Sequence, residues 1–61
     1  MKEKVKQLIA EHLVRQGQLK ITLHNLNVIG ALTEDFENQI LDEIREIEES
    51  IQKLRDILKV I

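Results

Sequence analysis

The segment EHLVRQGQLKI, from Glu11 to Ile21, decides between two folds for the first half of the chain. In one fold a helix ends at Gly17, a residue type that suits a helix C-cap, and the alternating apolar residues after it form a strand over 18–24. Nothing else in the chain alternates in this way, so the strand would need a partner strand from a second molecule. In the other fold, a single helix continues through Gly17.

The continuous helix explains more of the sequence. A stripe of residues at alternating steps of four and three passes Gly17 without a change of phase, as residues on one helical face do. This first stripe consists of Val5, Ile9, His12, Gln16, Leu19, Leu23, Leu26 and Gly30. We therefore predict a helix over about 3–29, in which Gly17 costs ~1 kcal/mol relative to alanine.

The second half of the chain has a single apolar seam with charged residues between its members, which is typical of a heptad helix. The seam consists of Phe36, Ile40, Ile44, Ile47, Ile51, Leu54, Leu58 and Ile61. Thr33 can cap this helix, and the acidic residues that follow suit the positive end of a helix dipole. The pattern predicts a helix over 34–60.

Residues 30–33 are the predicted turn. Gly30 can adopt the left-handed conformation that ends a helix, and Thr33 begins the next one. A connection this short makes the two helices antiparallel neighbours. The predicted fold is therefore all-α, a two-helix antiparallel hairpin that forms one domain over 1–61.

A second apolar stripe lies on the opposite side of the first helix, again with steps of four and three. It consists of Ala10, Val14, Gly17, Ile21, His24, Val28 and Ala31. Its alanine and glycine residues would permit close approach of another backbone. A hairpin needs only one stripe on each helix, so the second stripe predicts contact with another chain. The alternative is that these are ordinary apolar residues scattered over the surface, without a role in association.

We expect a homodimer in which the first helices meet across a two-fold axis to make a four-helix bundle, with a higher oligomer as the alternative. Gly17 would lie near the middle of this contact. The first 33 residues carry a net charge of +3 and the remaining 28 carry −5, which gives the total of −2. An antiparallel dimer could therefore set basic tips against acidic flanks of the other subunit.

The length and composition favour association. A chain of 61 residues buries only ~60% of the surface that its unfolded form exposes, so a single copy has little core. Disulfides are excluded because there is no cysteine. No apolar run approaches a membrane span and the N-terminal region lacks the pattern of a signal peptide, so we expect a cytoplasmic protein without a membrane partner.

Two polar residues, His12 and Gln16, interrupt the first stripe. They could form a polar core layer that fixes the helix register or responds to acid, or the histidine could lean out at the edge of the stripe. His24 lies twelve residues beyond His12 and no cysteine accompanies either, so we predict no metal site. The acidic run 42–50 is typical of a solvated helix face. No catalytic grouping, cofactor motif or cleft for a small-molecule substrate is present, so we predict no enzymatic activity and no cofactor.

The outline of two helices joined by a short turn resembles the Rop family of plasmid RNA-binding hairpins, which dimerise into four-helix bundles. The resemblance lies in length and shape, and it implies RNA binding along a basic face. Lys2, Lys6, Arg15 and Lys20 would have to supply that face, but the chain is acidic overall, which disfavours nucleic acid as a partner. We predict a non-enzymatic regulatory or adaptor protein that self-associates and binds a partner protein. RNA binding and a purely structural oligomerisation module are the alternatives.

Overall fold

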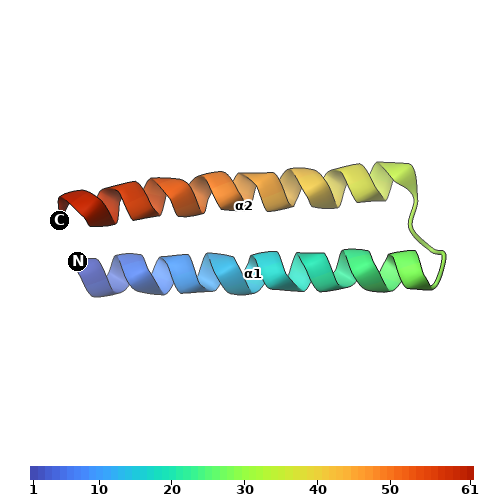
Figure 1. The fold of residues 1–61 in the computed structure, drawn as a ribbon, viewed down its shortest axis with the longest axis horizontal. Coiled ribbons are helices and arrows are strands. Elements are labelled where there is room, and N and C mark those ends of the chain that lie inside the picture. Colours follow the sequence, from blue (N-terminus) through green and yellow to red (C-terminus); the bar gives the residue numbers. More distant parts are fainter.

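The computed structural model describes all 61 residues as two α-helices, α1 (Lys2–Val28) and α2 (Glu34–Val60). The helices pack side by side and antiparallel, so that both ends of the chain lie at the same end of the molecule (Figure 1). The predicted hairpin is confirmed, and the structure contains no strand. The helix passes unbroken through Gly17 and begins and ends one residue earlier than the predicted 3–29, whereas α2 has the predicted limits.

The end of α1 is a glycine cap. Gly30 has a φ of 73°, in the left-handed region that favours glycine. Its N–H donates to the carbonyl oxygen of Asn27 at 3.2 Å, and the N–H of Ala31 donates to that of Leu26 at 3.0 Å. This pair of bonds is the Schellman motif, which satisfies carbonyl groups that the helix end would leave free.

Thr33 begins α2 as predicted. Its backbone is extended and its Oγ1 accepts a hydrogen bond of 3.2 Å from the N–H of Phe36. The first turn of α2 carries Glu34, Asp35 and Glu37, whose charges favour the positive end of the helix dipole. The two caps together confine the connection to a few residues.

The core is a single line of side chains between the helices. Only four residues are buried: Val5, Ile40, Ile44 and Ile51. The other members of the first stripe within α1 are half-buried, as are Ile47, Leu54 and Leu58 of α2. The first stripe of α1 therefore faces the predicted seam of α2.

The molecule is a rod of 46 × 15 × 10 Å, one helix deep. Its radius of gyration is 14.2 Å, against about 10.5 Å for a compact domain of this length. The exposed surface is 4770 Å², roughly 700 Å² more than a compact monomer of the same mass would expose. Each helix is thus covered on one side only.

Candidate interaction surface

The second stripe of α1 lies on the surface of the hairpin. Val14, Ile21 and Val28 are 61%, 62% and 69% exposed, and Ala10, His24 and Ala31 are exposed as well. At about 100° per residue the second stripe lies roughly 140° around α1 from the first. No part of α2 covers it. The apolar residues of α1 are therefore divided between a covered face and an open one, whereas most of those of α2 gather on one face.

Gly17 lies within the second stripe and has no role inside the hairpin. A Cβ atom added at this position would meet no heavy atom within 4 Å. Its φ is not positive either, because Gly30 is the only residue with a positive φ. Neither packing nor backbone conformation within one chain requires a glycine here, although it costs the helix ~1 kcal/mol relative to alanine.

Two leucines that the sequence analysis did not assign to this surface extend it. Leu13 of α1 and Leu41 of α2 are each 44% exposed. Leu13 lines a shallow hollow between the helices together with Glu48. Leu41 follows one helical turn after Glu37, which lines a second hollow on the same side with His24. The helical angle of Leu13, between the two stripes of α1, was a signal in the sequence, whereas Leu41 lies outside the seam of α2 and joins this surface only through the packing of the two helices. We call the second stripe with Leu13 and Leu41 the apolar face.

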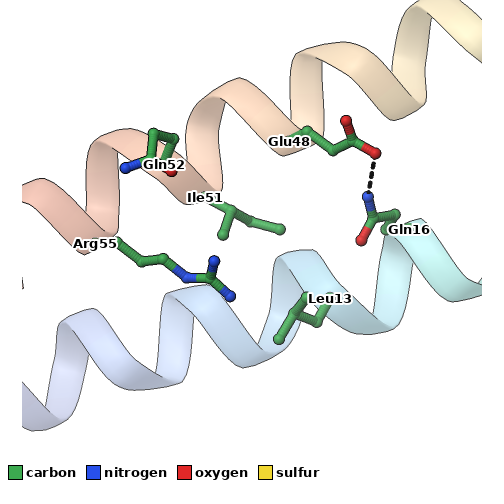
Figure 2. Close-up of a pocket in the computed structure, with 6 residues that line it drawn as sticks. All are labelled: Leu13, Gln16, Glu48, Ile51, Gln52 and Arg55. Carbon is green, nitrogen blue, oxygen red and sulfur yellow. Dashed lines mark hydrogen bonds between the residues drawn. The ribbon is translucent and has the colours of Figure 1, made fainter.

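The first hollow shows how the helices meet beside this apolar face. Figure 2 shows Leu13 of α1 and Ile51 of α2 between a hydrogen bond on one side and the side chain of Arg55 on the other. The hydrogen bond runs from Nε2 of Gln16 to Oε1 of Glu48 over 2.8 Å. Since the hollow is shallow and partly polar, it offers no enclosed site for a small molecule.

The two polar residues of the first stripe differ in their contacts. Gln16 is half-buried and bridges to α2 through Glu48. His12 is also half-buried, but its Nδ1–H donates to the carbonyl oxygen of Leu8, 2.7 Å away in its own helix. The structure therefore gives the suggested polar layer only one member that reaches the other helix.

A second polar contact between the helices lies on the other side of the core line. Nη2 of Arg15 is 3.4 Å from Oε2 of Glu43, and both side chains are more than half exposed. Arg15 and Gln16 are adjacent and therefore point about 100° apart. They approach α2 from opposite sides of its seam, which leaves the apolar line between them. Exposed ion pairs of this kind contribute little to stability.

Charge is separated along the rod. The end with the two termini, residues 1–9 and 53–61, carries six basic and two acidic side chains, a net +4. The part of the rod next to the turn, residues 21–44, carries five acidic side chains and neither lysine nor arginine. The hairpin thus has a basic end and an acidic end.

The other polar residues considered for metal binding or catalysis lack the neighbouring side chains that would complete such a site. His24 is exposed and lines the second hollow with Lys20 and Glu37. No group of three or more histidine, aspartate or glutamate side chains is placed to hold a metal ion. The acidic residues Asp42, Glu46 and Glu49 are exposed on the outer side of α2. Neither helix contains an apolar segment long enough to span a lipid bilayer.

Comparisons with known proteins leave the apolar face as the main guide to function. No protein-family model matches the chain, and no curated protein or solved structure matches it either.

Proposed function

We propose that this protein is a non-enzymatic interaction module, a helical hairpin that pairs with a second copy through its apolar face to form a four-helix bundle. In this form it acts as an adaptor or regulator that presents helical surfaces to a partner protein. The proposal rests mainly on the exposed apolar face and on Gly17, which lies within it. A glycine without a role in its own hairpin supports close approach by another chain.

The exposed area supports association on quantitative grounds. The hairpin exposes 4770 Å², an excess of roughly 700 Å² over a compact monomer of its mass. A standard protein interface removes about 800 Å² from each partner. Covering the apolar face would therefore bring the chain close to the exposure of an ordinary compact protein.

Sedimentation velocity at micromolar protein tests the proposal. We expect the wild-type chain to sediment with twice the mass of one chain. Ile21→Glu should weaken or abolish the dimer, because it places a charge on the apolar face. Thr22→Glu is the matched control, since Thr22 is exposed but lies about 100° away on the helix and off that face.

Two results would overturn the proposal. One is a wild-type chain that stays monomeric and helical by circular dichroism at concentrations well above the micromolar range. The other is a pair of variants, Ile21→Glu and Thr22→Glu, that dimerise equally well. If the proposal holds, wild type and Thr22→Glu should capture a protein partner to the same extent, and Ile21→Glu should capture less.

RNA binding is the alternative function, and the distribution of charge along the rod disfavours it. Six of the nine basic side chains lie at one end of the rod rather than along a face, and Arg15 is paired with Glu43. A fluorescence titration with RNA at low and moderate salt distinguishes the two functions. Tight binding with a steep salt dependence would favour RNA as the partner.

A further inference from the structure

We infer that the second copy docks antiparallel on the apolar face in one register, with Gly17 facing Ile21 of the partner subunit. This inference rests on the proposed self-association and adds its orientation and alignment. The same register places Val14 opposite His24 of the partner subunit and Ala10 opposite Val28 of the partner subunit. Each of these contacts occurs twice about the two-fold axis.

The position of the second stripe along α1 selects this register. Within α1 the stripe begins at Ala10 and ends at Val28, whereas the helix itself begins at Lys2. When Ala10 lies opposite Val28 of the partner subunit, the two α1 helices overlap over 10–28, and this overlap contains every stripe residue that belongs to α1. The alignment also explains why the stripe is absent from the first eight residues of α1, because these project beyond the end of the partner's α1.

The sizes of the stripe residues fit the same register. Gly17, the smallest, lies opposite the long apolar side chain of Ile21 of the partner subunit, and Ala10 lies opposite a valine. A register one heptad shorter in overlap would place Val14 opposite Ala31 of the partner subunit, which lies outside α1 in the connection. Small residues opposite large ones allow close packing, which the helix pair requires for a dense interface.

Charge selects the antiparallel orientation. Residues 2–9 of each α1 project toward the turn of the partner subunit, so that Lys6 approaches the acidic residues at the start of the partner's α2. Lys2 lies farther out, about 12 Å along the axis beyond the end of the partner's α1. In a parallel dimer the two basic ends would lie side by side, and so would the two acidic halves. Because charges are screened beyond about 8 Å at physiological salt, the neighbouring side chains decide the preference.

Cysteine cross-linking tests the register directly, because the chain contains no cysteine of its own. We would oxidise an equimolar mixture of two full-length variants, Val14→Cys and His24→Cys, in a glutathione buffer. The expected product is the mixed disulfide, with little disulfide between identical chains. Two copies of residue 14 would lie about 15 Å apart along the helix axis in this register, beyond the ~7 Å that a disulfide allows between Cα atoms. The pair Ala10→Cys and Val28→Cys should behave in the same way.

The outcomes separate this inference from the proposed function. Disulfides between identical chains at both Val14→Cys and Val28→Cys would indicate a parallel dimer, which overturns the inference but leaves self-association intact. A dimer in sedimentation that gives no mixed disulfide with either pair would overturn the register. A monomer in sedimentation would overturn both. Circular dichroism of each variant confirms that the helices are retained.

Discussion

Gln16 of α1 donates a hydrogen bond of 2.8 Å from its Nε2 atom to the Oε1 atom of Glu48 on α2. It is the one polar residue of the first stripe whose side chain reaches the other helix, since His12 bonds within α1. Single polar residues at such positions in helical seams specify register at some cost in stability. The bond therefore serves alignment of the hairpin more than its stability.

Gln16→Leu should raise the free energy of unfolding by about 1 kcal/mol, because a half-buried leucine covers apolar surface. Glu48 is exposed and would remain hydrated. Gln16→Ala should instead lower the free energy of unfolding by about 0.5–1 kcal/mol, since it removes the bond without adding apolar contact. Urea unfolding at one protein concentration measures both. A Gln16→Leu chain less stable than Gln16→Ala would show that the hydrogen bond outweighs packing.

Gly30→Ala should lower the free energy of unfolding by about 1–2 kcal/mol, because an L side chain is strained in the left-handed region. Added volume is not the cause, since a Cβ atom there would meet nothing within 4 Å. Gly30→Asn should cost less, because asparagine tolerates this conformation better. Equal losses for the two variants would argue against the left-handed cap as the source.

Gly17→Ala should stabilise an isolated hairpin but destabilise the proposed dimer, so its effect distinguishes the two. In an isolated hairpin it should stabilise the helix by about 1 kcal/mol, because alanine is the better helix former. In the proposed dimer the methyl group enters the space used by the opposing chain, so the dissociation constant should rise. Sedimentation equilibrium measures this constant. Thr22→Ala is the control, because it also improves helix propensity but lies off the apolar face. A dimer unchanged or strengthened by Gly17→Ala would mean that the chains do not approach closely there.

The two helices and their turn could be predicted from local sequence signals. The pairings of side chains between the helices could not. Gly30 and Thr33 each define a helix end through their own conformation or hydrogen bonding, so the turn could be predicted from sequence. The continuity of α1 followed from the unbroken phase of its first stripe. The different contacts of His12 and Gln16 depend on how far each helix is rotated toward the other, which spacing along one helix does not determine. Leu13 and Leu41 were missed for a related reason, because their shared surface is formed by two helices together.

Lys6→Glu should weaken the dimer by up to about thirtyfold, because the two-fold axis doubles the contact and each exposed ion pair typically contributes 0.2–1 kcal/mol. In the inferred register this side chain approaches the acidic start of the partner's α2, and the substitution replaces attraction with repulsion. Its pairing with Glu3 inside one chain, at 3.9 Å and largely exposed, adds little. Lys4→Glu makes the same change in net charge on the opposite side of α1, so it is the control. The difference between the two dissociation constants should shrink as salt rises from 0.05 to about 0.5 M, because the Debye length shortens. Equal dissociation constants for the two variants at low salt would contradict the antiparallel arrangement of charges.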